Sequence, residues 1–281
     1  LTPICDDKPK STINRPFQAC SDMCVMVTLL NSRKMITPAT LEAVKRCSKN
    51  GIDIVLSSSR NLDGIEHIPK KYGLDCYISA LGGGLILDKD RKIIFEKGMS
   101  VKTAKRVVNF IESELPFVTW NIFTAREWIV KNTYDKRVVR EQNIVEAYAK
   151  KGSVSDLDSD VSVDKMLCMC SPSDTEAAAK TLSAAFGELA VVQSSDILIE
   201  INPKGVSKGL GVEKLCEHLG ISTEQAIAFG DNFNDLEMLE TAGLGFAMEN
   251  APAEFKAKFE HIAPSNDSDG IYKVLCDLGL C

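Results

Sequence analysis

The sequence predicts an α/β protein whose core is a doubly wound parallel sheet, interrupted by an inserted α+β domain. Two observations predict this fold class. In the first and last thirds of the chain, apolar runs of strand length alternate with helical patterns, which is typical of a parallel sheet covered by helices on both faces. In the middle third the alternation gives way to a hairpin and to helices mixed with strands, as expected for an insertion.

The first third of the chain contains the opening elements of the core. Residues 1–16 are polar and rich in proline, and we interpret them as a loose arm. A short strand is expected at residues 17–21. Thr37 has the side chain of a helix N-cap and Pro38 suits the first helical position, so a helix should begin there. The elements expected next are the end of this helix at Gly51, an apolar strand at 52–57, a helix near 61–72 and a strand at 76–81.

The remaining two thirds place the insertion between two parts of the core. Residues 81–98 are interpreted as a hairpin, and the strand-then-helix alternation returns from 196–201 onwards. We therefore expect a core at 17–85 and 195–281, with the inserted domain at 86–194. The elements expected inside the insertion are helices near 101–114, 139–150 and 173–186 and strands near 117–131 and 165–170.

Composition narrows the classes of function. The net charge of -6 argues against a nucleic-acid partner, because phosphate backbones require a basic face. No apolar run approaches the roughly 20 residues that span a bilayer, and the first residues lack the apolar segment of a signal peptide, so no membrane partner is expected. The ten cysteines follow no disulfide spacing and are interpreted as buried apolar groups in a reducing compartment, which favours a cytoplasmic location. We expect a monomer or a weak homo-oligomer.

The segment at 226–239 contains the strongest functional signal. A strand pattern ends in Gly230 and is followed by Asp231, Asn234 and Asp235. Ligands of doubly wound sheets bind beyond the carboxyl ends of the strands, and carboxylate and amide oxygens suit Mg²⁺. The structural alternative is a helix N-terminus, where aspartate is favourable against the helix dipole.

Two further segments place polar groups at strand ends. Lys208 opens a helix between two glycines, a position where a cation opposes the helix dipole unless it faces an anion. The alternative is a solvated lysine in a glycine-flanked turn. Ser58 follows the strand at 52–57 and can donate its hydroxyl to a phosphoryl oxygen, although serine triplets are also common in turns. Together the three segments predict a metal site, a cation and a hydroxyl donor at three strand ends of one sheet.

From about residue 17 to residue 275, the chain resembles the Cof-type, class IIB branch of the haloacid dehalogenase-like (HAD) phosphatases. GDNFNDLEML resembles the fourth motif of that family, VSKG the third and VLSSSR the second. The resemblance implies a Rossmann-like core with a type IIB cap as the inserted domain. It also implies an Mg²⁺-dependent phosphatase that acts on small phosphorylated metabolites, usually sugar phosphates, through an aspartyl phosphate.

The same resemblance implies roles for individual residues. The residues implied to act in catalysis are Asp22, Ser58 and Lys208. The residues implied to bind substrate are Ser58, Ser59, Arg60, Lys208 and Asn234. The residues implied to bind the metal are Asp22, Asp231 and Asp235.

The first motif departs from the family pattern Asp-x-Asp-Gly-Thr-Leu, because residues 20–31 are CSDMCVMVTLLN. In the alignment that we prefer, Asp22 is the nucleophile and CVMV stands in place of Asp-Gly, because residues 17–21 are long enough for a strand leading into Asp22. In the other alignment Cys24 replaces the nucleophile and Met26 the acid. Either way the second aspartate is absent, and the loss of a general acid lowers the rate by on the order of 10²–10⁴-fold. Ser59 also stands where the family usually has glycine.

These departures leave two functional hypotheses. The first is an Mg²⁺-dependent phosphatase of small phosphorylated metabolites. The second is a pseudoenzyme that keeps the phosphate-binding residues and binds phosphorylated ligands without hydrolysing them.

Overall fold

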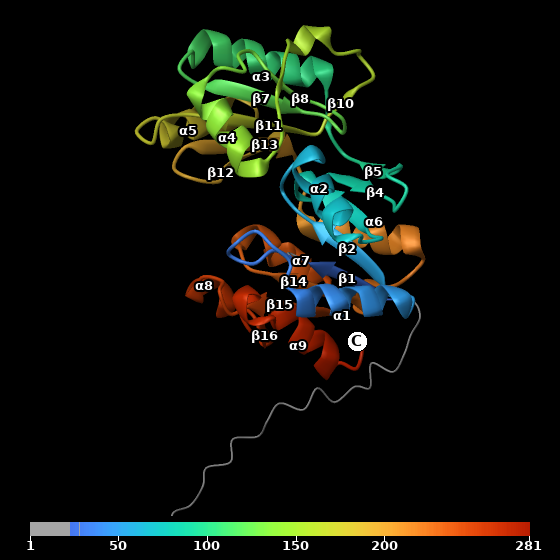
Figure 1. Ribbon diagram of the computed structural model, residues 1–281. Coiled ribbons are helices and arrows are strands. Elements are labelled where there is room, and N and C mark those ends of the chain that lie inside the picture. The colour runs from blue at the N-terminus through green and yellow to red at the C-terminus, as the bar shows by residue number, and fades with distance from the viewer. Residues whose placement is uncertain (1–22, 28) are drawn as a thin grey trace, which may run out of the picture.

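The computed structural model describes residues 23–27 and 29–281, which form two large sheets and a two-stranded one (Figure 1). The largest sheet has eight strands in the order β16-β15-β14-β1-β2-β3-β4-β5. Its strands from β16 to β3 pair in parallel, and β4 and β5 add an antiparallel edge. The bounds of these strands, in chain order, are Cys24–Val27 (β1), Asp53–Ser57 (β2), Tyr77–Ala80 (β3), Leu85–Leu87 (β4), Ile93–Glu96 (β5), Ala226–Gly230 (β14), Leu244–Met248 (β15) and Ile262–Ala263 (β16).

Helices cover both faces of this eight-stranded sheet. Successive residues of one strand enter different hydrophobic clusters: Ile54 and Leu56 pack in one, and Val55 packs in the other. The helices on the first face are α1 (Pro38–Lys49), α2 (Asp63–Tyr72) and α9 (Gly270–Asp277). Those on the second are α6 (Lys208–Leu219), α7 (Leu236–Thr241) and α8 (Ala253–Lys256). The predicted doubly wound α/β fold is therefore confirmed, and burial on both faces explains why its strands are continuous apolar runs.

The start of α1 follows the predicted capping. Thr37 has extended backbone angles, and its side-chain oxygen accepts a hydrogen bond from the amide of Thr40 at 3.3 Å. Pro38 occupies the first turn, where its missing N–H would have no partner in the helix.

The second large sheet is mainly antiparallel and has six strands in the order β12-β13-β11-β7-β8-β9. Helices α3 (Val101–Glu114) and α5 (Thr175–Ala185) pack on it around a separate hydrophobic cluster, while α4 (Lys136–Val145) lies toward the core. The strands are Thr119–Phe123 (β7), Trp128–Val130 (β8), Lys150–Lys151 (β9), Lys165–Met169 (β11), Leu189–Gln193 (β12) and Leu198–Pro203 (β13). β6 (Met99–Ser100) and β10 (Ser162–Val163) form the two-stranded sheet.

The two large sheets divide the chain at different points from the predicted boundaries. β4 and β5, which follow the predicted boundary at 85, extend the core sheet. β13 follows the predicted boundary at 195, yet it pairs antiparallel with β11 and β12 in the second sheet. The apolar sequence of a strand does not show which of the two sheets it joins, so only the observed pairing assigns it to one. We propose that the core and the cap meet at 97–98 and 204–207.

The first strand also differs from the prediction. CVMV, which the preferred alignment placed after the first strand in the position of Asp-Gly, forms β1 in the middle of the core sheet between β14 and β2. Four consecutive apolar residues suit a strand that is buried on both faces. The arm at 1–16, the strand expected at 17–21 and Asp22 lie outside the described residues.

The cysteines within the described ranges follow the prediction with one exception. Cys276 and Cys281 form a disulfide, so the interpretation of the cysteines as isolated apolar groups is wrong for this pair. The free cysteines of the described ranges are all buried, namely Cys24, Cys47, Cys76, Cys168, Cys170 and Cys216. No described helix combines the length and the apolar character that a bilayer span requires.

Candidate active site

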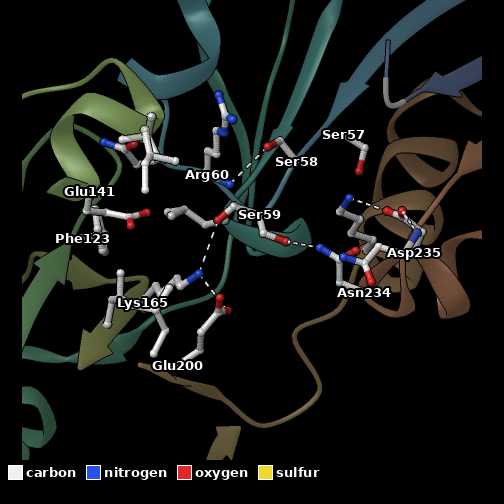
Figure 2. A pocket seen from close by; sticks show the side chains of 18 of the residues that line it. Ser57, Ser58, Ser59, Arg60, Phe123, Glu141, Lys165, Glu200, Asn234 and Asp235 are labelled. Carbon is white, nitrogen blue, oxygen red and sulfur yellow. Dashed lines mark hydrogen bonds and ion pairs between the residues drawn. The ribbon is translucent and has the colours of Figure 1, made fainter. Parts of the chain in front are cut away.

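The three segments predicted to carry the site meet at a cavity of about 330 Å³ between the core sheet and the cap (Figure 2). They are not three strand ends of one sheet as predicted, because the strand before Lys208 is β13 of the cap sheet. Ser58 reaches the cavity from the end of β2, Lys208 from the start of α6 and Asp231 from the end of β14. Every predicted site residue that the structure describes lines this cavity; these are Ser58, Ser59, Arg60, Lys208, Asp231, Asn234 and Asp235.

Lys208 and Asp235 form a buried ion pair at the floor of the cavity. Their relative exposures are 4% and 1%, and the lysine Nζ lies 2.5 Å from the aspartate Oδ1. The other carboxylate oxygen accepts hydrogen bonds from the backbone amides of Asp231 and Asn232. Lys208 follows directly on Ser207, whose side chain caps α6 by accepting from the amide of Leu210. The pair therefore ties the start of α6 to the loop that carries Asp231.

Asp231 is the carboxylate that remains available at this edge of the sheet. One of its oxygens accepts a hydrogen bond from Asn250 at 3.0 Å. Burial raises the pKa of Asp231 above its ordinary value, and the neighbouring charge of Asp235 raises it further. A cation beside Asp231 would relieve both effects, and carboxylate oxygen is a ligand that Mg²⁺ favours.

The three-carboxylate metal site implied by the resemblance is incomplete in the described part of the chain. Both oxygens of Asp235 already accept hydrogen bonds, one from Lys208 and the other from the amides of Asp231 and Asn232. Asp22 lies outside the described residues. Within 23–27 and 29–281, no three His, Cys, Asp or Glu side chains are grouped so that they could hold a metal ion.

The turn after β2 presents hydroxyl groups to the cavity. The amide of Arg60 donates to the Ser58 Oγ at 3.2 Å, which leaves the hydroxyl proton of Ser58 available to an anion. The turn is held from both sides, since the Ser58 amide donates to Ser79 and the Gly82 amide donates to the Ser58 carbonyl. Ser59 accepts a hydrogen bond from the Asn234 side chain at 2.9 Å.

The cap supplies residues to the cavity that the sequence did not single out. Lys165 opens β11 and is 6% exposed; its Nζ lies 2.7 Å from the carboxylate of Glu200 on β13. Glu141 of α4 also lines the cavity, and burial raises its pKa. The apolar lining of the cap side comes from Phe123, Trp128, Leu167 and Leu198. No local signal marks Lys165 as a site residue, because it sits in an otherwise apolar strand.

Comparison with known proteins assigns the family. The model of the haloacid dehalogenase-like hydrolases matches residues 27–275. The chain belongs to the haloacid dehalogenase-like hydrolases. The prediction from the second, third and fourth motifs is thereby confirmed, and with it the expectation of an enzyme of the type that includes phosphatases.

Two relatives and one solved structure illustrate the similarity. The stress response protein YhaX of Bacillus subtilis is 30% identical over 86% of this hydrolase and 87% of the relative. The 5-amino-6-(5-phospho-D-ribitylamino)uracil phosphatase YwtE of the same organism is 27% identical over 87% of this chain and 92% of its own. A haloacid dehalogenase-like hydrolase from Bacteroides thetaiotaomicron has the same fold, with a TM-score of 0.81 at 24% identity, covering 91% of this chain and 98% of that one.

The hydrolase departs from its family at the carboxyl end of β1. Val27 is level with Leu56 of β2 and Phe229 of β14, and the next residues of the sequence are Thr28, Leu29, Leu30 and Asn31. Residues 23–31 therefore bring no carboxylate to the edge of the sheet where Asp231 lies.

Cys24, the alternative nucleophile, lies at the opposite end of β1. It pairs with Ala226 and Asp53, the first residues of β14 and β2, and it does not line the cavity. A hydrogen bond with Cys216 and burial hold the pKa of the Cys24 thiol far above its ordinary range. The interpretation of Cys24 as the nucleophile is therefore wrong, because a buried neutral thiol away from the cavity cannot attack a bound ester.

Proposed function

We propose that this hydrolase acts on phosphoric monoesters of small metabolites, sugar phosphates among them, with Mg²⁺ as its cofactor. The observation that carries the proposal is the position of Lys208, a buried cation at the start of α6 that lines the same cavity as Ser58 and Asp231. Helix N-termini and cations both favour bound phosphate. The relative YwtE is named for a phosphorylated small molecule, which agrees in class with this ligand.

The described residues supply charge and orientation to this reaction. Lys208 and the first amides of α6 neutralise the phosphoryl oxygens, and Ser58 donates its hydroxyl to one of them. Asp231, held by Asn250, would ligate Mg²⁺, which when bound stabilises negative charge on the phosphoryl group. Asp235 keeps Lys208 and the Asp231 loop in place.

The preferred alignment implies Asp22 as the nucleophile, whereas Met23, the next residue, lies at the amino end of β1. The assignment of Asp22 can be tested directly. With Mg²⁺ and the activated ester p-nitrophenyl phosphate, we expect slow turnover that is lost in Asp22→Asn and in Lys208→Met. The missing second aspartate lowers the expected rate by on the order of 10²–10⁴-fold, less for an aryl ester whose leaving group needs no proton. Equal rates for wild type and Asp22→Asn would refute the assignment of Asp22.

A second candidate function is phosphate-ester binding without hydrolysis, and the position of β1 favours it. Met23, the residue after Asp22, accepts a hydrogen bond from the Asp53 amide at the amino end of the sheet, roughly 13 Å of strand away from the cavity edge. This candidate predicts that glucose 6-phosphate raises the melting temperature and stays intact. Release of inorganic phosphate in the same sample would contradict it.

A further inference from the structure

The peptide group between Ser59 and Arg60 joins the cap to the phosphate-binding hydroxyl (Figure 2). Its carbonyl oxygen accepts a hydrogen bond from Lys165 Nζ of the cap at 3.4 Å. Its N–H, on the Arg60 side, donates to the Ser58 Oγ at 3.2 Å. Because a peptide group is planar, a cation that fixes the carbonyl also fixes the direction of the N–H.

Lys165 is built to make this contact. It is 6% exposed, and its charge is balanced by Glu200 at 2.7 Å within the cap. A buried lysine needs hydrogen bonds beyond its ion pair, and the Ser59 carbonyl supplies one from the core. Charged donors also polarise the peptide they bind, which strengthens the hydrogen bond on its other side.

The Ser59 side chain extends the connection to the fourth motif. Its Oγ accepts from Asn234 Nδ2 at 2.9 Å, and Asn234 belongs to the loop between Asp231 and Asp235. Since the family usually has glycine at this position, this side-chain bond distinguishes the chain from the family pattern. Ser59 thus contacts the cap through its carbonyl and the segment between Asp231 and Asp235 through its hydroxyl.

We propose that Lys165 is a positioning residue of the cap, which acts through the Ser59–Arg60 peptide to orient the Ser58 hydroxyl toward bound phosphate. Docking of the cap then strengthens phosphate binding in the core, although Lys165 itself need not touch the phosphoryl group. The proposal rests on the proposed function for its ligand, and on the hydrogen-bond geometry for its coupling.

Phosphate affinity in a double-mutant cycle tests the coupling. Inorganic phosphate is titrated calorimetrically, with Mg²⁺ present, into wild type, Lys165→Met, Ser58→Ala and the double variant. Lys165→Met should weaken phosphate binding by about 5- to 10-fold, the lower part of the usual range of coupling between sites. In the Ser58→Ala background the same substitution should change the affinity less than about twofold, because no hydroxyl is left to orient. An equal loss in both backgrounds, or no loss in wild type, overturns the proposal.

Two comparisons separate positioning from damage to the cap. Lys165→Arg keeps the charge and a donor and should restore most of the affinity. Lys150→Met is the matched control, since Lys150 forms a 2.7 Å ion pair with Glu127 on the cap surface away from the Ser59 peptide. It should leave phosphate affinity unchanged. If Lys165→Met unfolds the cap, the same measurements are made on the double variant Lys165→Met/Glu200→Gln, in which no unpaired carboxylate is left.

Amide exchange tests the coupling without any ligand. In Lys165→Met the Arg60 amide should exchange with solvent at least about tenfold faster than in Lys150→Met, because its hydrogen bond to Ser58 loses its support. Unchanged exchange of the Arg60 amide refutes the proposal. Failure of wild type to bind phosphate refutes the proposed function instead, and the exchange measurement still decides the role of Lys165.

Discussion

Replacing Asp164 by asparagine should stabilise the protein at alkaline pH and much less in acid. Asp164 lies between β10 and β11, is fully buried, and meets Glu96, the last residue of β5 in the core sheet. Ser162 donates to its Oδ1 at 3.0 Å, while its Oδ2 has no partner as a carboxylate. Burial, and then the charge of Glu96, raise the pKa of Asp164 to about 7. Below about pH 7 the folded protein therefore keeps a proton on Asp164, at its contact with Glu96.

The magnitude follows from linkage between proton binding and folding. At about 1.4 kcal/mol per pKa unit, raising the pKa from 3.8 to about 7 amounts to roughly 4 kcal/mol, an upper value. Below about pH 4, Asp164 is protonated in the folded and the unfolded chain, and no penalty exists. Between about 4 and 7 only the folded chain keeps the proton, so the free energy of unfolding falls as the pH rises. Above about 7 the full penalty is present.

Asparagine removes this dependence, because it is neutral at every pH and its amide can donate to Glu96. The gain in unfolding free energy for Asp164→Asn should be larger at pH 8 than at pH 5 by about 2.5 kcal/mol. Urea unfolding, followed by the fluorescence of Trp120 and Trp128 in the cap, measures it. Asp160→Asn is the matched control, since Asp160 is exposed on the same segment, and should stay within about 0.5 kcal/mol at both pH values. An equal gain at pH 5 and pH 8 would refute the reasoning.

Two further substitutions test the packing around the start of α6. Lys208→Met should lower the free energy of unfolding by about 3 kcal/mol, because it leaves buried Asp235 with backbone donors but no cation. Lys214→Met, at a side chain that is 37% exposed, should change it by less than about 0.5 kcal/mol. Equal effects would contradict the role of burial. Gly83→Ala should cost more than about 2 kcal/mol, since Gly83 has a φ of +91° and an added Cβ would lie 2.2 Å from the Ser207 carbonyl oxygen. Gly187→Ala, with open space around it, is the control; a Gly83→Ala protein as stable as that control would show that the start of α6 can shift freely.

The core and its polar strand ends could be predicted because their signals are local. The strand at 226–230 and the capped start of α1 each depend on a few consecutive residues. Parallel pairing of the strands then brings Ser58 and Asp231 to the same edge of the core sheet. The Lys208–Asp235 ion pair was not predicted, and Lys208 does not follow from the same rule, because the strand before it, β13, pairs antiparallel in the cap sheet. The positions of Ser58 and Asp231 depend on the topology of the core sheet, and the alternation of strands and helices in the sequence predicts that topology.

The cap residues could not be predicted, because antiparallel register places them. Lys165 reaches the cavity since β11 pairs with β13 in the register that sets Met166 opposite Ile201, between segments more than thirty residues apart. β1 illustrates the same limit. The letters CVMV do not by themselves say that this segment forms a strand between β2 and β14, and only the pairing places it there.

The proposed boundary of the cap changes how the cap and the phosphate site are connected. β13 ends at Pro203, and Lys208 follows after only four residues, so the last strand of the cap leads almost directly into the start of α6. The other connection, at 97–98, lies against it, because Lys97 Nζ donates to the Gly205 carbonyl at 3.4 Å. A rotation of the cap about these paired connections must therefore pull on the segment that positions Lys208, while it makes or breaks the Lys165 contact with Ser59. The pull on the linker before Lys208 and the change in the Lys165 hydrogen bond would both act on the same bound phosphate. The Lys165 variants alter only the second, which is why they can distinguish the two.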